Sequence, residues 1–454
     1  MANRFGHHAV VIGGSIAGLI TARVLSDYFD QVTIIERDQI EAKPAVHKSV
    51  PQGHHVHALL LGGERMLSSL YPSFTDKLFE LGATRLRIGK DAAWMLPDGK
   101  AYTRTGTVRE PMDAGIDMYA QSRGLLEYCV RQFTTAVPNV RLETSASVQE
   151  LIYEGNRVRG ARYLREGESR SMEADLVVDA GGRGSHAPRW LKELGFETPE
   201  ETTIGVDFAY ASAKFRINNV DDPEKLLLFL GPPPRFPNGA IIELIENDTW
   251  HVSMGGRFGI YPPADPEGFV EFAKSLSNPK LYHYLKTAER VSEIVPYRFP
   301  TSVLRHYERL ASVPERFVIL GDAICSFNPI YGQGMSSAAL QAKALQQLLS
   351  ERAGQSGGLD GLALAFFPKA AEVVMTPWIL AASSDFAFPQ TKGERPPNFA
   401  ESVRYGMTLE EIAGEDPAVQ FLLMEVFQLL KPITALMEDP LRSRVLARME
   451  KKSS

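Results

Sequence analysis

The segment Val10-Val-Ile-Gly-Gly-Ser-Ile-Ala-Gly-Leu19 decides the fold that we expect for this chain of 454 residues. The apolar run 9–12 predicts a buried strand, and the Gly-rich stretch 13–18 predicts a tight turn. Residues 19–25 then have a helical pattern. A strand that runs through a glycine turn into a helix is typical of the first part of a dinucleotide-binding βαβ unit.

A second apolar run, residues 32–35, completes this unit and ends in Glu36. The acid follows the first glycine at the offset of about 20 residues that the dinucleotide fingerprint has. We expect Glu36 to accept hydrogen bonds from the hydroxyls of an adenosine ribose, and Arg37 beside it to contribute to cofactor binding. The alternative for the glycines alone is a purely structural turn, but strand, helix and acid together favour nucleotide binding.

One position of the turn departs from the Gly-x-Gly-x-x-Gly pattern, because Ser15 stands where the second glycine belongs. Serine is small, and we expect its hydroxyl to face a phosphate. Glycines allow the backbone to approach a pyrophosphate, whose charge is favoured at the start of a helix. The residues predicted to bind the nucleotide here are Gly13, Gly14, Ser15, Ala17 and Gly18.

Bulk composition is that of an ordinary soluble globular protein, with 44% hydrophobic and 23% charged residues. The net charge is −6 and no block of five like charges occurs, which argues against nucleic acid and anionic membranes as partners. The two cysteines, Cys129 and Cys325, form no disulfide framework or metal motif and fit a reducing cytoplasm. We expect no signal peptide and no transmembrane segment.

An antiparallel sheet is expected in the middle of the chain. Alternating or apolar runs predict four strands, at residues 208–215, 225–230, 240–245 and 249–254. Helices are predicted at residues 57–70 and 122–137, the second one with Ser122 as its N-cap. A Gly/Ser-rich linker, 353–359, precedes a mainly helical C-terminal region. The segment 419–437 is expected to form a packed amphipathic helix pair.

Two further strand-to-glycine junctions follow the first. The strand 174–179 runs into the turn 180–184, and the strand 317–320 runs into Gly321-Asp322. We expect Asp322 to bind ribitol hydroxyls, although a helix-capping role is the alternative. A loop with Pro329, Gly332 and Gly334 then leads to a helix that starts near Met335. Its N-terminus would stabilise the anionic pyrimidine of a reduced flavin.

These motifs resemble the FAD-dependent monooxygenases of the aromatic-hydroxylase (para-hydroxybenzoate-hydroxylase-like) fold, and within it the squalene-epoxidase-like and polyether-epoxidase-like branch. Residues 13–18 with Glu36 are similar to the ADP-binding motif of this family. Asp179-Ala-Gly-Gly-Arg183-Gly-Ser185 is similar to its Asp-Gly motif, and the segment 321–335 to its ribityl- and ring-binding motif. Order and spacing match from residue 9 to about residue 345, and the last hundred residues carry no recognisable motif.

The resemblance implies further positions near the cofactor. Arg123 matches an arginine that contacts FAD at the start of a helix. Gln52, His54 and His57 belong to a Gln-Gly-x-His-x-His stretch that the family branch places near the flavin. The Arg298-Phe-Pro300 segment matches one that precedes the last flavin strand. The histidines lie too close together in sequence for tetrahedral metal binding, so we expect no metal.

The fold class expected from the resemblance is α/β: a Rossmann-like FAD-binding domain of glutathione-reductase type, an inserted and mainly antiparallel substrate sheet, and a helical C-terminal region. The FAD-binding domain would comprise three parts, the substrate domain two, and the C-terminal region one. These segments are 1–75, 121–190 and 298–350 for FAD, 76–120 and 191–297 for the substrate, and 360–454 for the helical region.

The expected function is that of an FAD-dependent monooxygenase of secondary metabolism. NAD(P)H, or a flavin-reducing partner, would reduce FAD, and a flavin hydroperoxide would transfer one oxygen atom of O₂ to a small hydrophobic substrate. The product would be an epoxide or a phenol, and the resemblance favours an alkene substrate. Arg183 and Tyr210 are candidates for the flavin or substrate face, although Arg183 could form only a salt bridge. No catalytic side chain is assigned.

Three other functions are compatible with the motifs. A geranylgeranyl-reductase-like saturase would reduce alkenes on the same fold. A flavin-dependent halogenase would need a lysine beside a tunnel and a Trp-x-Trp-x-Ile-Pro segment, and the four tryptophans of this chain do not form that segment. A flavin-binding protein without turnover is the third alternative.

Overall fold

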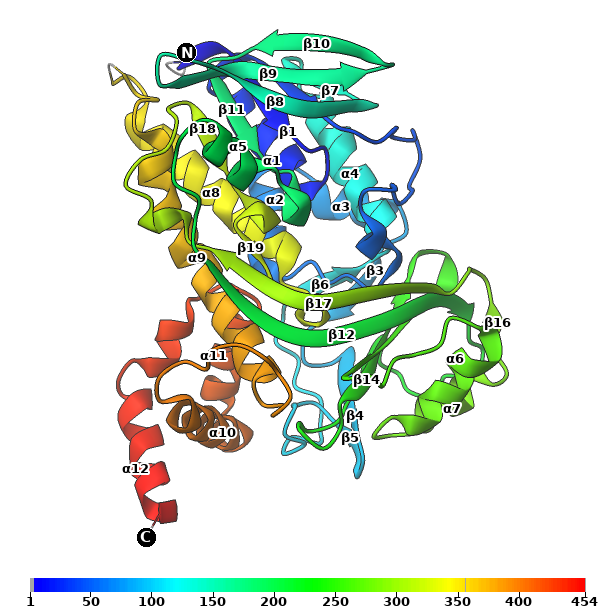
Figure 1. Ribbon diagram of the computed structural model, residues 1–454. Coiled ribbons are helices and arrows are strands. Elements are labelled where there is room, and N and C mark those ends of the chain that lie inside the picture. Colours follow the sequence, from blue (N-terminus) through cyan, green and yellow to red (C-terminus); the bar gives the residue numbers. More distant parts are fainter. Residues whose placement is uncertain (1–3, 356, 454) are drawn as a thin grey trace.

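The computed structural model describes residues 4–355 and 357–453. Residues 1–3, 356 and 454, which belong to the predicted first segment, the linker and the C-terminal region, lie outside the described residues. A five-stranded parallel sheet forms one end of the molecule (Figure 1). Its strands, in spatial order, are β18 (Phe317–Ile319), β11 (Leu176–Asp179), β1 (Gly6–Ile12), β2 (Phe29–Ile35) and β7 (Val140–Glu143).

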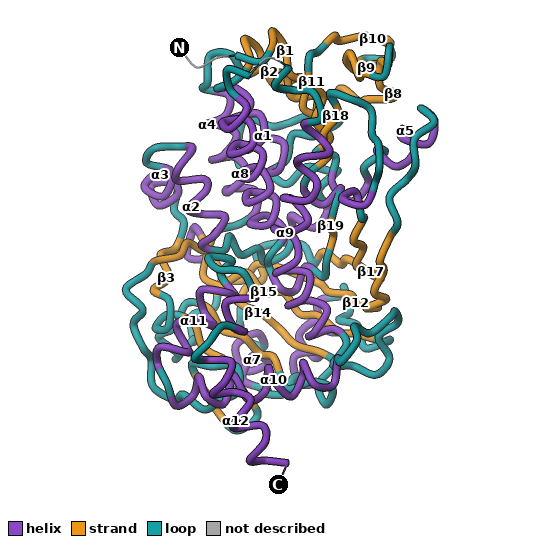
Figure 2. Tube along the Cα trace, turned by 90° about the vertical axis from the view of Figure 1, so that its left-hand side faces the viewer, coloured by secondary structure: helices purple, strands orange, loops and turns teal. Residues whose placement is uncertain are grey.

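Helices cover one face of this parallel sheet, and a small antiparallel sheet covers the other (Figure 2). The strand residues Val10, Val11 and Val177 are completely buried between the two layers. The helices are α1 (Ile16–Ser26), α2 (Leu61–Leu70), α3 (Phe74–Glu80), α4 (Arg123–Thr135) and α8 (Gly334–Arg352). The antiparallel strands are β8 (Ala146–Glu154), β9 (Arg157–Arg165) and β10 (Glu168–Glu173), and the short helix α5 (Ala187–Glu193) follows β11.

A nine-stranded sheet crosses the middle of the molecule, with the long strands β12 and β17 side by side (Figure 1). All of its pairings are antiparallel except that between β13 and β4. The strands are β19 (Cys325–Ser326), β17 (Val295–Arg305), β12 (Glu201–Arg216), β15 (Thr249–Arg257), β14 (Asn238–Ile245), β13 (Leu226–Leu230), β4 (Ala92–Leu96), β5 (Gly99–Ala101) and β16 (Glu289–Arg290).

The two faces of this large sheet differ in chemistry. The outer face is apolar and packs against α6 (Pro266–Phe272) and α7 (Lys280–Leu285) in a separate core. Sheet residues in that core include Ala211, Ala213, Val252 and Met254. The inner face carries the alternate residues of the same strands, among them Tyr210 and Ser212, and lies against the segment 55–57. A separate two-stranded sheet, β3 (Thr84–Arg87) with β6 (Asp117–Ala120), packs against strands β13 and β14 of the large sheet.

Helices α10 (Phe399–Glu415), α11 (Pro417–Phe427) and α12 (Leu441–Ser453) form a bundle at the opposite end from β8–β10 (Figure 1). Helix α9 (Leu362–Asp385) connects this bundle to α8. The predicted fold class, α/β with an antiparallel insertion and a helical C-terminal region, is therefore confirmed.

Most predicted elements lie where the sequence pattern placed them, including the N-cap of α4, where Ser122 Oγ accepts from the Leu125 N–H at 3.3 Å. The predicted helix 57–70 was wrong at its start, since α2 begins only at Leu61. Residue 60 is extended, with φ −68° and ψ 156°. The Val56 N–H donates to Ser253 Oγ at 2.9 Å, so this segment lies against the large sheet instead of coiling.

Candidate active site

The three predicted strand-to-glycine junctions meet at one edge of the parallel sheet. Ile12 pairs with Asp179, and Asp179 pairs with Ile319, so β1, β11 and β18 end in a single row. The turns that follow these strands, although they are far apart in the sequence, are therefore neighbours in space. In parallel sheets, ligands bind outside the carboxyl ends of the strands, and this edge is the candidate site.

The first turn fits a pyrophosphate. Gly13 has φ +102°, and a Cβ there would lie 2.6 Å from the Ala180 carbonyl oxygen. A Cβ on Gly18 would lie 1.8 Å from the Gly13 carbonyl oxygen, so only glycine fits this approach of helix to strand. Helix α1 has no side-chain cap at its N-terminus, which leaves backbone N–H groups and a partial positive charge for an anion.

Glu36 is 5% exposed and lies where the sequence pattern placed it. Its Oε2 accepts from the Gly14 N–H at 2.6 Å, and its Oε1 accepts from the Asp38 N–H at 2.8 Å. Each carboxylate oxygen keeps a second lone pair, so the ribose contact stays a prediction. Arg37 next to it is exposed.

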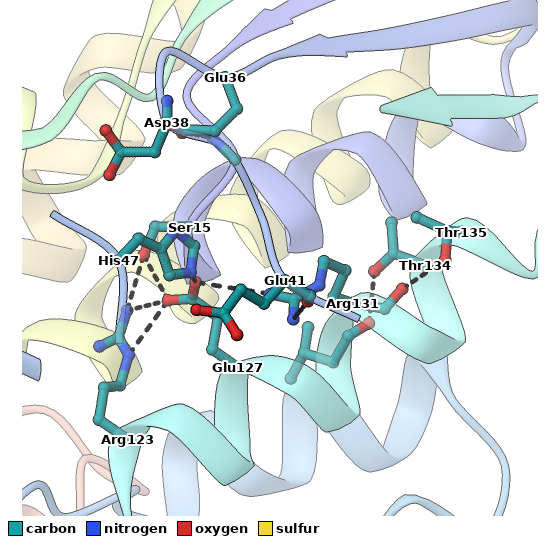
Figure 3. A network of polar contacts seen from close by, with 12 residues as sticks. Ser15, Glu36, Asp38, Glu41, His47, Arg123, Glu127, Arg131, Thr134 and Thr135 are labelled. Carbon is teal, nitrogen blue, oxygen red and sulfur yellow. Dashed lines mark hydrogen bonds and ion pairs between the residues drawn. The ribbon is translucent and has the colours of Figure 1, made fainter. Parts of the chain in front are cut away.

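Ser15 has a different partner from the predicted phosphate. Its hydroxyl donates to Glu127 Oε2 at 2.7 Å and accepts from Arg123 Nη2 at 2.7 Å. Figure 3 shows these side chains converging between the turn and α4. The serine in place of glycine thus connects the first glycine turn to α4, which gives a structural reason for the departure from the motif.

Glu127 is the centre of this network and was not foreseen from the sequence. It is 2% exposed, and Arg123, Arg131 and His47 surround it (Figure 3). Burial alone would raise its pKa, but the positive charge of Arg123 and the His47 hydrogen bond outweigh burial and lower the pKa to about 2. In the sequence, the i,i+4 spacing of Arg123, Glu127 and Arg131 was the pattern from which this ion-pair network could have been predicted.

The third junction places Asp322 where the charges of Arg123 and Arg183 act on it. Burial raises its pKa to about 6, and the charges of Arg123 and Arg183 oppose that rise. Ala17 of α1 is close to this turn, because a Cβ on Gly321 would lie 3.2 Å from the Ala17 Cβ. The predicted nucleotide and ribityl positions are therefore adjacent.

The predicted ring-binding residues form a short loop before α8. Pro329 begins a turn that ends at Gly332. The backbone of Gly332 is left-handed, with φ +67°, a conformation that glycine adopts easily. Gly334 is the first residue of α8, and Met335 beside it is buried. Helix α8 has no side-chain N-cap, so its first N–H groups face the site edge with a partial positive charge.

The histidine segment lies against the inner face of the large sheet, but a different histidine from those predicted is central. His54 is exposed, and its carbonyl accepts from His251 Nε2 at 3.0 Å. His55 is 2% exposed and packs against Tyr210 with ring centroids 4.2 Å apart. Sequence reasoning assigned no role to His55, and no local pattern distinguished it from His54.

Burial keeps the histidines of this segment neutral. It lowers the pKa of His55 to about 2 and that of His57 to about 4. His57 Nδ1 lies 2.8 Å from the His55 carbonyl oxygen, and Gln52 lies in the turn that precedes them. Neither histidine therefore changes charge near neutral pH.

Arg183 and Tyr210 both belong to an aromatic wall on the inner face of the sheet. The Arg183 guanidinium lies 4.5 Å from the centroid of Phe299, and its buried Nη1 has no hydrogen-bond partner among the described residues. Tyr297 lies between Arg183 and Tyr210, with its ring centroid 5.4 Å from that of Tyr210. This wall connects the Asp322 edge to His55.

Together these residues fit an extended dinucleotide that ends in a planar ring. Two helix starts, α1 and α8, have no side-chain cap, so their first N–H groups are available to anionic groups. Glu36 and Asp322 supply carboxylates that can accept hydrogen bonds from hydroxyl groups. Arg183 Nη1 has no hydrogen-bond partner among the described residues and can donate to a ligand. Among the described residues no group of three or more His, Cys, Asp or Glu side chains could hold a metal.

One described helix, α9, is long and apolar enough to cross a membrane by length and composition. Half of its most apolar window is buried inside the molecule, and core helices of soluble proteins meet the same criterion.

Comparison with solved structures shows the class of fold. The flavin-dependent brominase Bmp2 superimposes over 99% of this chain and 100% of its own, with a TM-score of 0.70 and 15% identity. p-Nitrophenol 4-monooxygenase PnpA from Pseudomonas putida DLL-E4 superimposes over 94% of this chain and 99% of its own, with a TM-score of 0.62 and 17% identity. The fold is that of the flavin-dependent oxidoreductases.

The chain belongs to the same family as protein Rv3254 of Mycobacterium tuberculosis (strain ATCC 25618 / H37Rv). The two are 31% identical over 461 aligned positions, which cover 98% of this chain and 95% of that protein. A more distant relative is digeranylgeranylglycerophospholipid reductase of Methanosarcina acetivorans, 24% identical over 73% of this chain and 72% of its own length. No family model matches the chain.

Proposed function

We propose that this protein is an FAD-dependent monooxygenase that inserts one oxygen atom of O₂ into a hydrophobic organic substrate, with NAD(P)H as the reductant. The observation that carries the proposal is the row Ile12–Asp179–Ile319, which brings three glycine turns to one sheet edge. One extended cofactor would touch all three. FAD, when bound, supplies the electrons that activate O₂.

The chain's own residues would bind, orient and exclude water. The α1 N-terminus would hold the pyrophosphate, Glu36 the adenosine ribose, and Asp322 the ribityl chain. The remaining predicted positions, Gly332 and the α8 start, would receive the ring. The aromatic wall of Tyr210, Tyr297 and Phe299 would close the substrate side against water, which competes with oxygen transfer.

One observation favours oxygen insertion over halogenation, although halogenases share the fold. The Trp-x-Trp-x-Ile-Pro segment that we expect of a halogenase is absent from the sequence. Epoxidation in preference to ring hydroxylation rests on the sequence resemblance alone.

A second candidate is a flavin-dependent reductase of carbon–carbon double bonds. The 24% identity to the digeranylgeranylglycerophospholipid reductase favours it. The site geometry serves both reactions, because each needs a flavin beside an apolar substrate.

Labelled oxygen separates these functions. Purified protein is incubated with FAD, NAD(P)H, ¹⁸O₂ and a panel of polyenes and arenes, and products are analysed by mass spectrometry. The proposal predicts one labelled oxygen atom in the product, the other in water, and one NAD(P)H oxidised per product. Alkene reduction without O₂ would support the reductase, and a product that requires bromide or chloride would support halogenation. Either result would contradict the proposal.

A further inference from the structure

A chain of hydrogen bonds links His55 to the inner face of the large sheet. The Val56 N–H donates to Ser253 Oγ at 2.9 Å. Ser253 Oγ and Ser212 Oγ are hydrogen-bonded to each other across β15 and β12. Ser212 Oγ lies 2.7 Å from His55 Nδ1. Ser212 is 1% exposed, so its hydroxyl has no access to solvent.

Counting donors and acceptors along this chain favours one histidine tautomer. Ser253 already accepts from a backbone N–H, so its hydroxyl proton is free to donate to Ser212. Ser212 then donates its own proton to His55 Nδ1, and every hydroxyl is satisfied. The opposite direction sends the proton of the half-buried Ser253 to a group outside this chain of hydrogen bonds. The direction that satisfies every hydroxyl within the chain places the His55 proton on Nε2.

That Nε2–H group has no hydrogen-bond partner among the described residues, although the side chain is buried. A buried donor without an acceptor is unfavourable by about 1 to 3 kcal/mol, so a partner is expected. The ring lies at the end of the aromatic wall, 4.2 Å from Tyr210 and 5.8 Å from Tyr297 between ring centroids. Tyr297 in turn adjoins Arg183, near the Asp322 edge.

We propose that His55 donates its Nε2–H to a carbonyl oxygen of the organic substrate, and that the substrate is a planar, unsaturated carbonyl compound. This inference rests on the proposed function, because it assigns the aromatic wall to the substrate. With Nδ1 occupied by Ser212 and the proton on Nε2, His55 is only a donor toward this side, so it selects an oxygen acceptor and moves no proton. Aromatic side chains on one side favour a flat, conjugated molecule.

Two probes of the same shape test the proposal. Acetophenone carries a carbonyl where α-methylstyrene carries a methylene group. Affinities for the protein with FAD are measured by equilibrium dialysis without O₂ or NAD(P)H. Wild type is expected to bind acetophenone about tenfold more tightly, the effect of one neutral hydrogen bond. His55→Phe should remove the preference, His55→Gln should keep part of it, and the exposed His283→Phe should leave it unchanged.

Nitrogen-15 NMR tests the tautomer directly. His55 is expected to carry its proton on Nε2 and to show no titration between about pH 5 and pH 9. Its Nε2–H resonance should shift when acetophenone binds, and Ser212→Ala should release the tautomer. The backbone ¹⁵N resonances also report the fold of each variant. If they show that His55→Phe is misfolded, the binding preference of His55→Gln is used in its place.

The proposal fails if the proton is on Nδ1, if wild type binds both probes equally, or if neither binds. It also fails if FAD alone shifts the Nε2–H resonance and acetophenone does not, because the acceptor would then belong to the cofactor. Since the binding assay needs no turnover, a negative labelled-oxygen result with intact probe selectivity would overturn the monooxygenase function and not the role of His55.

Discussion

The hydroxyl of Tyr331 donates to Oδ1 of Asp385 at 2.7 Å. The same oxygen accepts from Arg257 Nη2 at 2.7 Å and from Asn328 Nδ2 at 3.0 Å. Asp385 ends α9, whereas Asn328 and Tyr331 belong to the predicted ring-binding loop. One carboxylate oxygen thus joins the C-terminal helices, the large sheet and that loop, a role that sequence reasoning did not give the C-terminal region.

Replacing Asp385 should therefore destabilise the fold and the loop together. Asp385→Ala leaves Arg257, which is 4% exposed, without its counter-charge. Loss of one partner of a buried pair costs about 3 to 5 kcal/mol, measured by denaturant unfolding. Hydrogen exchange of residues 328–332 should accelerate. Ser383→Ala, at an exposed position of α9, should change stability by less than about 0.5 kcal/mol. Unchanged exchange in the loop would contradict the role of Asp385.

A side chain at Gly18 should abolish cofactor retention. The added Cβ of Gly18→Ala would lie 1.8 Å from the Gly13 carbonyl oxygen, so the turn must open. Flavin released by denaturation and measured by absorbance should fall to background. Gly406→Ala in α10, away from the three glycine turns, is the matched control, since nothing lies within 4 Å of its Cβ position. A fully loaded Gly18→Ala protein would show that the first turn does not bind the nucleotide.

FAD affinity should depend on pH through Asp322. Burial raises the pKa of this carboxyl to about 6, above its ordinary value. The ionised form accepts hydrogen bonds from ribityl hydroxyls, so affinity should fall as pH decreases through about 6. Without FAD, the free energy of unfolding should change in the opposite direction and decrease as pH rises through about 6. The reason is that the raised pKa makes ionisation of Asp322 unfavourable in the folded state. Fluorescence titration of FAD from about pH 5 to pH 8 measures the effect. A titration curve that Asp322→Asn leaves unchanged would exclude this carboxyl.

Glu127 should contribute stability that is lost only in strong acid. Its folded pKa of about 2 lies below the ordinary value of a glutamate, so the contribution is complete above about pH 4.5 and disappears as pH falls through about 2. Glu127→Gln should lower the free energy of unfolding by about 3 kcal/mol at pH 7. The difference from wild type should shrink between about pH 4.5 and pH 2 in urea unfolding curves. A constant difference would contradict the ion-pair origin.

Local sequence predicted the parts of the site that local chemistry determines. The strand–glycine–helix junctions at residues 13, 181 and 321 follow from apolar runs and from backbone conformations that glycine adopts easily. Alternation also predicted the β12–β15 strands. These elements need only neighbouring residues to be recognised, and the position of Glu36 and the start of α8 follow from them.

The partners of individual side chains could not be predicted in this way. Ser15 and Glu127 are 112 positions apart, and Ser212 and His55 are 157 positions apart. Such pairs depend on how whole elements pack. Only weak local signals existed: polar residues at every second position of β12, and charged residues at i,i+4 spacing in α4. The choice of His55 instead of His54 depended on which side of the segment meets the sheet.

The row Ile12–Asp179–Ile319 also constrains how the protein is made. Its three strands are separated by well over a hundred residues each, and α8, which follows the last of them, ends at Arg352. A ribosome must therefore release most of the polypeptide before the nucleotide edge exists. Loading of the proposed cofactor would therefore be a late event in biosynthesis, and until then the apolar strand β1 must be shielded by other segments or by chaperones.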